Sequence, residues 1–275
     1  MCSSDLIALM LGLTWGGRRY AWESPQIVGL FAASAALWAL FAWRVMTAVE
    51  PFIPLSVLRD GAVRVGTAAA FFGVGTVIAL TIVLPLYAQL ALGLSVSASA
   101  WSIVALQGAA TLTSVVGGRL LVRFTHYKVV PLIGLVVSIA SLVPLVLAPT
   151  GFSPIVALGL IALVGAGIGP TFPFTIVVVQ NSVALHQLGV TTGAMNFFRA
   201  LGSTFIVTGF GAIVLAGAPA IRGVSAGAAL AGADAALAFR WVFATTMLCF
   251  IVALACILAL QERPLRGSGA PQSAS

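Results

Sequence analysis

Long apolar stretches separated by short polar segments dominate the sequence. Seven of them contain almost no charged side chains and are long enough to cross a bilayer, since about 20 helical residues cover roughly 30 Å of hydrocarbon. They are residues 26–43, 65–92, 100–118, 129–148, 154–179, 191–215 and 241–260. An eighth stretch, residues 7–15, is too short to cross at about 1.5 Å per residue. The pattern predicts seven membrane-spanning helices and one truncated helix.

Polar segments divide this array of helices. Residues 47–64 mix prolines and acids with apolar residues, which predicts a cytoplasmic amphipathic connector along the membrane surface. It separates residues 7–46, a truncated span plus a linker transmembrane helix, from a six-helix bundle at residues 65–262. Residues 263–275 are rich in Pro, Gly and Ser and are predicted to be a disordered cytoplasmic tail. Residues 1–6 lack signal-peptide features and are interpreted as a non-native scar that replaces lost upstream sequence.

The composition agrees with a chain dissolved in lipid. Hydrophobic residues make up 61% and charged residues 7%, whereas soluble domains carry about 25% charged residues. The mean hydropathy is +1.15. The net charge of +7 does not indicate nucleic-acid binding, because Lys and Arg stand singly between apolar stretches. The three cysteines have no CxxC spacing, which excludes a metal or redox motif of that kind. We therefore expect an all-α integral membrane protein without a cofactor.

The basic residues are distributed unevenly between the two sides of the predicted membrane. Cytoplasmic loops retain positive charge, so the richer side is predicted to be cytoplasmic, with the C-terminus inside a bacterial inner membrane. That side carries nine residues: Arg44, Arg59, Arg64, Arg119, Arg123, Lys128, Arg199, Arg263 and Arg266. The other side carries four: Arg18, Arg19, Arg222 and Arg240. Arg199 falls inside a span and is predicted to reach the cytoplasmic surface as an anchor.

Acidic residues are absent from the predicted spans. Proton relays in membrane pumps usually use an intramembrane carboxylate or histidine, and both histidines, His126 and His186, fall on predicted loops. The six acids are Asp5, Glu23, Glu50, Asp60, Asp234 and Glu262. Any proton site must therefore lie elsewhere.

A few uncharged polar side chains do fall in or near the spans. Placing them in lipid costs free energy, so each either bonds a neighbouring helix or, as a set, they line a polar-spotted cavity. The substrate-cavity candidates are Tyr87, Gln89, Gln107, Thr111, Gln180, Asn181 and Asn196.

Glycine and proline interrupt two spans. The run from Gly165 to Pro170 superficially matches a phosphate-binding loop, but it lies inside an apolar span without a preceding strand, which excludes a nucleotide site. Gly165 and Gly169 are four residues apart and leave one helix face bare for close packing. Pro170 and Pro173, like Pro85 in an earlier span, are predicted to break helical hydrogen bonding.

Several of these segments resemble one known family. They are the Glu50–Leu55 run, Leu84–Gln89, Val179–Asn181 through Gly202, and the order of six spans after a two-span linker. The chain from Trp15 to Arg263 resembles the fourteen-span drug:proton antiporter branch of the major facilitator superfamily, and within it the C-terminal half.

The resemblance extends to a cytoplasmic gating loop between two helices. Gly118, Arg119, Arg123 and Lys128 match its glycine and basic positions. Val122 and Thr125 stand where the family has an acid and a second glycine, so the resemblance implies anchoring of the positive face rather than a charge relay.

The resemblance implies the C-terminal half of a proton-coupled exporter of lipophilic or cationic drugs, working by alternating access. Its partners would be membrane lipids, protons, a small lipophilic substrate and a missing N-terminal six-helix bundle, without which it would be inactive. A transporter of another class (lipid, peptide or siderophore) and a non-transporting truncated scaffold remain as alternatives. A membrane enzyme is not expected, since the sequence has no clustered His, Asp, Glu or Cys.

Overall fold

The computed structural model describes residues 61–123, 127–184, 187–216 and 233–260, with a few isolated positions between Ser24 and Ala36. Contacts divide the chain into two units, residues 1–56 and 57–275. The predicted scar, truncated span and tail lie outside the described residues, as does the predicted connector up to Asp60, and only isolated positions of the predicted linker helix are described.

Every regular element in the described ranges is a helix, and six helical spans are long and apolar enough to cross a membrane. The spans are Gly61–Leu90, Val96–Leu121, Val129–Leu147, Pro154–Asn181, Leu188–Val214 and Ala236–Ala259. The predicted all-helical six-span fold is confirmed. The first described helix starts at Gly61 and so includes Arg64, which lies before the predicted boundary and is exposed. A long arginine side chain can extend its charge away from an apolar helix.

The first two spans each contain a short π-helix. The first span consists of α4 (Gly61–Ala69), η1 (Ala70–Val74) and α5 (Gly75–Leu90). The second consists of α6 (Val96–Ser99), α7 (Trp101–Ile103), η2 (Val104–Gly108) and α8 (Ala109–Arg123). The remaining elements are α9 (Val129–Leu147), α10 (Pro154–Ile168), α11 (Thr171–Asn181), α12 (Leu188–Ala216) and α13 (Ala233–Ala259).

The prolines act differently from one another. Pro85 lies inside α5 and Pro144 inside α9, and neither ends its helix. At Pro170 the regular α-helix is interrupted between α10 and α11, although the two together form one span. Membrane helices tolerate such interruptions because neighbouring helices satisfy the freed backbone groups.

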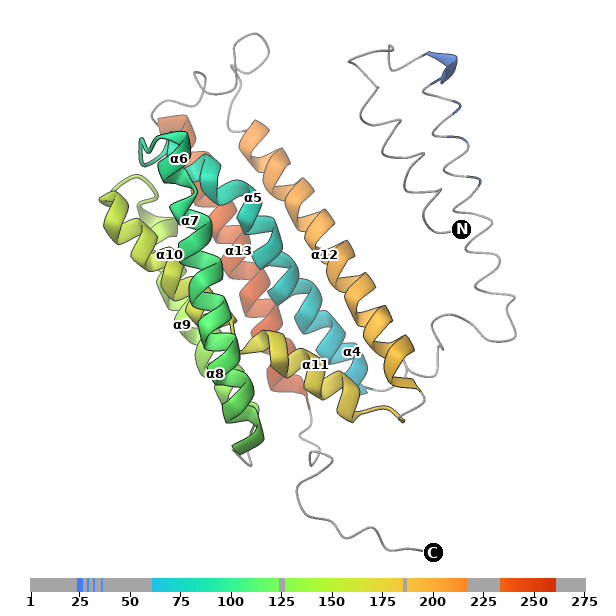
Figure 1. The fold of residues 1–275 in the computed structure, drawn as a ribbon. Coiled ribbons are helices and arrows are strands. Elements are labelled where there is room, and N and C mark those ends of the chain that lie inside the picture. Colours follow the sequence, from blue (N-terminus) through green and yellow to red (C-terminus); the bar gives the residue numbers. More distant parts are fainter. Residues whose placement is uncertain are drawn as a thin grey trace, which may run out of the picture. The chain divides into compact units, whose positions relative to one another are not determined.

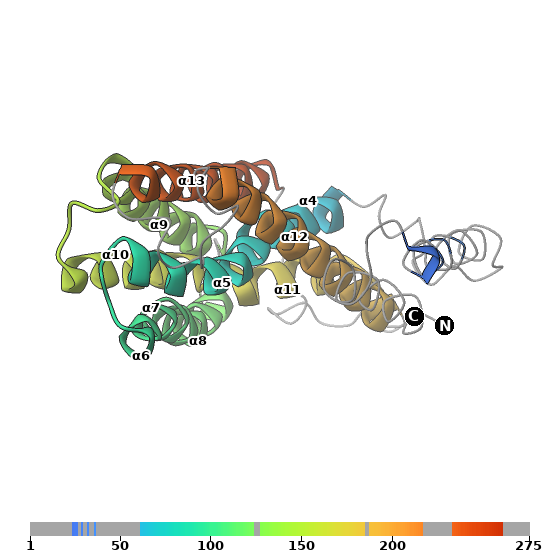
Figure 2. The same cartoon turned by 90° about the horizontal axis from the view of Figure 1, so that it is seen from above.

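The spans are covered to different extents (Figures 1 and 2). α10 packs between α9 on one side and η2 and α8 on the other, while α13 packs on α9 and α4, and α12 on α5 and η1. In an 18-residue stretch of the first span 61% of the residues are buried, against 22% in the span ending in α8 and 22% in α12. The second span and α12 therefore present the open faces of this unit.

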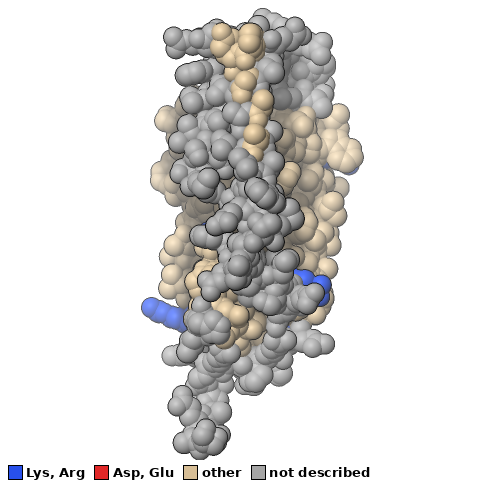
Figure 3. Space-filling model, turned by 90° about the vertical axis from the view of Figure 1, so that its right-hand side faces the viewer, with Lys and Arg blue, Asp and Glu red and all other residues tan. Residues whose placement is uncertain are grey.

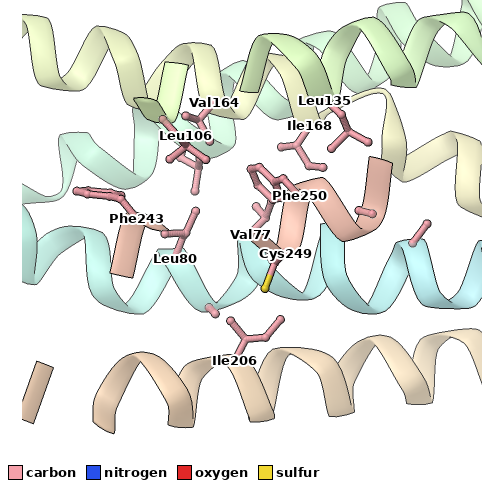
Figure 4. Packing of buried hydrophobic residues seen from close by; sticks show 14 of the residues in the cluster. Val77, Leu80, Leu106, Leu135, Val164, Ile168, Ile206, Phe243, Cys249 and Phe250 are labelled. Carbon is pink, nitrogen blue, oxygen red and sulfur yellow. The ribbon is translucent and has the colours of Figure 1, made fainter. Parts of the chain in front are cut away.

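The core is built mainly from aliphatic and aromatic side chains, and all six spans contribute to it (Figure 4). Because lipid is as apolar as these side chains, close packing rather than hydrophobic transfer stabilises their association. Members labelled in the close view are Val77, Leu80, Leu106, Leu135, Val164, Ile168, Ile206, Phe243, Cys249 and Phe250. A void of about 10 Å³ remains among Leu80, Leu84, Leu106, Leu142, Leu145, Ile161, Val164 and Phe243.

Glycines let α10 approach the second span at backbone distance. A Cβ at Gly165 would clash with the carbonyl oxygen of Leu106 and lie 2.9 Å from its carbonyl carbon. A Cβ at Gly169 would clash with the carbonyl oxygen of Ala110 and the hydroxyl of Thr113. The bare helix face formed by these two glycines is thus filled by the backbone of η2 and α8.

The opposite side of α10 meets α9 just as closely. Gly167 and Gly134 face each other, and a Cβ on either would clash with the carbonyl oxygen of the other. The Ser138 hydroxyl on α9 donates to the Val164 carbonyl at 2.8 Å. Contact on both sides leaves α10 no room for added side chains along this segment.

Candidate functional site

Tyr87 is a core residue in this structure. Its ring has no exposed surface and packs edge-on against Phe239 and Phe243 of α13, with centroid distances of 5.2 and 5.0 Å. Its hydroxyl donates to the carbonyl of Pro149, which lies in the turn after α9, at 2.6 Å. The structure therefore places this candidate inside the bundle and not on a substrate-accessible surface.

Gln89 lies near the end of α5 and joins two consecutive spans. Its side-chain Nε2 donates to the Ser99 hydroxyl of α6 at 3.1 Å. The turn between them contains Gly93 at a φ of 67°, a left-handed conformation that glycine adopts without strain. The contact indicates that Gln89 holds this turn.

Gln107 and Thr111 lie on the second span, one of the two that are least covered by the rest of the bundle. Gln107 is half-buried in η2, and Thr111 is exposed on α8, one turn further along. The Thr111 hydroxyl donates to the Gln107 carbonyl at 2.7 Å. This bond satisfies the hydroxyl without involving another helix.

Gln180 and Asn181 end α11 and lie beside the start of α12. The Gln180 side-chain amide donates to the Thr192 hydroxyl at 3.4 Å. Thr192 is one turn before Asn196, so the structure brings these three candidates to one end of the α11–α12 pair. Tyr87 and Gln89 lie near the far end of α5, so the seven candidates do not form a single cavity.

Asn196 is exposed on the open face of α12. Within the described residues its carboxamide has no hydrogen-bond partner, although α12 is an apolar span. The other exposed polar residues of this face, Thr204 and Thr208, donate to the carbonyls of Ala200 and Thr204 in their own helix. Asn196 is therefore the residue on this face that most requires water or another protein group beside it.

The basic residues of the described ranges gather toward one end of the bundle. Arg64 lies in the first turn of α4, Arg119 and Arg123 in the last turns of α8, and Lys128 directly before α9. Arg240 lies near the start of α13, at the opposite end. On the side view in Figure 3 the blue residues are few and separate, and no red residue appears among those described.

The structure also gives the positions of Arg199 and of the start of the predicted gating segment. Arg199 is half-buried, about 16 Å beyond the start of α12 at 1.5 Å per residue. Gly118 lies near Pro173, where an added Cβ would be 3.7 Å from the proline Cβ. The predicted gating segment from Gly118 to Lys128 thus begins beside the start of α11.

A groove that was not predicted from the sequence lies between the first span and α12. It has a volume of about 330 Å³ and is lined by Arg64, Thr67, Ala68, Phe71, Phe72 and Phe198. Phe71 and Phe72 are in edge-to-face contact at 4.9 Å. Part of this groove had a sequence signal, because Arg64 is the fourth residue of an apolar helix that continues into the Phe71–Phe72 pair. The packing of this helix against α12 depends on the tertiary fold and has no signal in the sequence.

A second groove, of larger volume, adjoins the first along α4. Its volume is about 630 Å³, and it is lined by Gly61, Ala62, Arg64, Val65, Ala68, Cys256, Ala259 and Leu260. Arg64 and Ala68 line both grooves and therefore lie where the two meet. We call these two depressions the aromatic groove (with Phe71, Phe72 and Phe198) and the end groove.

Comparison with known proteins identifies the type of bundle. The family model described as Major Facilitator Superfamily matches residues 6–207. Multidrug transporter protein MdtP of Bacillus subtilis (strain 168) is 31% identical over 210 residues, which cover 76% of this chain and 38% of the relative.

Two further relatives have different printed descriptions. Uncharacterized MFS-type transporter Rv1877 of Mycobacterium tuberculosis (strain ATCC 25618 / H37Rv) is 29% identical over 207 residues, covering 75% of this chain and 30% of the relative. Tetracycline resistance determinant of Streptomyces rimosus is 31% identical over 193 residues, covering 69% of this chain and 53% of the relative. The matched part of the chain thus spans between about a third and a half of the length of these relatives.

Proposed function

The chain belongs to the Major Facilitator Superfamily, and from this premise we propose that it is the C-terminal six-helix half of a secondary transporter of the fourteen-span drug:proton antiporter type. The proposed activity is export of lipophilic or cationic compounds by alternating access between two bundles, driven by protons. Relatives named for multidrug transport and tetracycline resistance support this substrate class. Because the chain covers only part of each relative, transport is expected to require the other bundle.

The exposed carboxamide of Asn196 is the observation that carries the proposal. An amide without a partner is unfavourable against hydrocarbon by about 1–3 kcal/mol on the scale of protein mutations. The open face of α12, where Asn196 lies, is therefore expected to meet water or a second bundle rather than lipid. An alternating-access transporter needs such a face beside its substrate path.

Efflux of ethidium, a lipophilic cation, tests the proposal in cells that lack their own exporters. We expect no efflux from cells expressing the chain alone, and efflux from cells expressing it joined to the part of MdtP that it does not cover. A protonophore should abolish that efflux. Efflux from the chain alone would contradict the need for a second bundle, and efflux that survives the protonophore would contradict proton coupling. Efflux from neither form, with the protein present in the membrane, would favour another substrate class or a non-transporting scaffold.

The Asn196→Leu variant of the joined form tests the role of the α12 face. Losing one polar contact to water or substrate should lower the initial efflux rate about tenfold, which corresponds to about 1.4 kcal/mol. Phe205→Leu is the matched control, because Phe205 is 67% exposed on the same helix and carries no polar group. Unchanged efflux by Asn196→Leu at equal expression would contradict the assignment.

The bundle is proposed to lie in the cell membrane with its C-terminus in the cytoplasm. The end that carries Arg64, Arg119, Arg123 and Lys128 should be cytoplasmic by the positive-inside rule, and α13 ends at Ala259 on that side. A green fluorescent protein fused after Ser275 should therefore fluoresce, whereas alkaline phosphatase at the same position should be inactive. The reverse pair of results would invert the topology.

A further inference from the structure

Arg64 connects two depressions that lie at different depths of the first span. The end groove surrounds the first residues of α4 and the last described residues after α13, from Gly61 to Leu260. The aromatic groove continues from Arg64 to Phe72, which lies about 12 Å further along the helix at 1.5 Å per residue. A ligand that occupied both would extend from the membrane boundary into the hydrocarbon region.

The chemistry of the lining changes in the same direction. Arg64 is exposed, and within the described residues its guanidinium has no ion-pair partner. Beyond it the aromatic groove offers the rings of Phe71, Phe72 and Phe198 and the Thr67 side chain. A guanidinium favours phosphate, to which it can donate two parallel hydrogen bonds. The three rings beyond the guanidinium give the groove an apolar wall against which an acyl chain can pack.

We propose that the two grooves beside α4 bind one acidic phospholipid, with its phosphate at Arg64 and an acyl chain in the aromatic groove. The order of the two parts along the span is that of a phospholipid in a bilayer, with the headgroup at the boundary and the chain inside. Charge complementarity selects an acidic headgroup, because a zwitterionic one brings its own cation to the guanidinium. The inference rests on the grooves and does not depend on the direction or substrate of transport.

The bound lipid would fill the space between the first span and α12. These two elements already touch at Gly202, where a Cβ would lie 2.7 Å from the Phe71 carbonyl oxygen, and at Gly75, 3.0 Å from the Ser203 nitrogen. From that contact toward Arg64, the aromatic groove lies between the two helices. An acyl chain in the groove would make van der Waals contacts with side chains that have no protein neighbour on that side within the described residues.

Native mass spectrometry of the full chain tests the proposal. The protein is extracted from bacterial membranes in mild detergent and offered equal amounts of palmitoyl-oleoyl phosphatidylglycerol and palmitoyl-oleoyl phosphatidylcholine. We expect one retained phosphatidylglycerol in preference to phosphatidylcholine. Arg64→Gln should lower that retention about tenfold, the effect of losing a charge-assisted hydrogen bond. Phe198→Ala should lower it several-fold through the chain.

Two matched variants separate the site from general surface effects. Arg119→Gln removes an exposed arginine outside both grooves, and Phe197→Ala removes the neighbouring ring, which does not line the aromatic groove. Both should retain phosphatidylglycerol as the parent chain does. Equal loss in Arg119→Gln and Arg64→Gln, or no loss in Arg64→Gln with the protein folded by circular dichroism, would overturn the proposal.

Two competitors test the identity of the ligand. Millimolar inorganic phosphate should not displace the lipid, and oleate should not replace it. Displacement by phosphate would instead indicate a simple anion site. Equal retention of oleate would indicate a site for small acidic amphiphiles.

Discussion

The Gly165→Ala variant is expected to lose about 3 kcal/mol or more of stability, whereas Gly159→Ala in the same helix should lose none. Overpacking a close contact typically costs about 1–3 kcal/mol, and more where the obstacle cannot move. At Gly165 the obstacle is the backbone of Leu106, and a Cβ would lie 3.1 Å even from the Leu106 Cα. At Gly159 no atom lies within 4 Å of an added Cβ.

The measurement is thermal unfolding of the two variants in one detergent. Alanine in a helix is otherwise favoured over glycine by about 0.5–1 kcal/mol, so the two variants should shift in opposite directions. Gly165→Ala should melt roughly 6–12 °C below the parent chain, at about 2–4 °C per kcal/mol for a chain of this size. Equal melting temperatures for both variants would mean that α10 does not contact η2 as closely as the structure shows.

Tyr87→Ala is expected to destabilise the bundle by about 3–5 kcal/mol, the range for deleting a large buried aromatic side chain. The ring is fully buried between Phe239 and Phe243, so its removal leaves a cavity in the core. Tyr87→Phe keeps the ring and removes only the bond to the Pro149 carbonyl, which leaves that carbonyl unpaired at a cost of about 1–3 kcal/mol.

The same pair of variants distinguishes a core residue from a cavity residue. Thermal unfolding should order them as parent, Tyr87→Phe and Tyr87→Ala, while ethidium efflux by the joined form of Tyr87→Phe should equal that of the parent at equal expression. A Tyr87→Phe variant with unchanged stability and lost efflux would support the role that the sequence predicted, with the hydroxyl contacting substrate.

The spans were predictable because hydropathy averages over about 20 residues and tolerates local errors. The orientation of each helix about its axis was not, because a helix that is apolar on all sides carries no periodic signal for its inner face. Tyr87 and Asn196 show the consequence. Both are single polar side chains in apolar spans, yet the first is fully buried and the second is exposed.

Glycine spacing predicted which face of α10 packs closely, but not which helices pack against it. Gly165 and Gly169, four residues apart, predicted a bare face for packing, but their partners Leu106 and Ala110 come from a distant span and have no signature of their own. The π-helices at Ala70–Val74 and Val104–Gly108 were likewise invisible, since each depends on backbone hydrogen bonds that several apolar sequences can form.

The small void in the core bears on whether protons can leak through the bundle. A cavity needs about 10–15 Å³ and two or more polar partners to hold even one water molecule. This one has about 10 Å³ and an entirely aliphatic and aromatic wall, including Leu80, Leu142 and Phe243. A dry void of this kind cannot hold a file of water along which protons could hop, so this part of the described core acts as an electrical insulator.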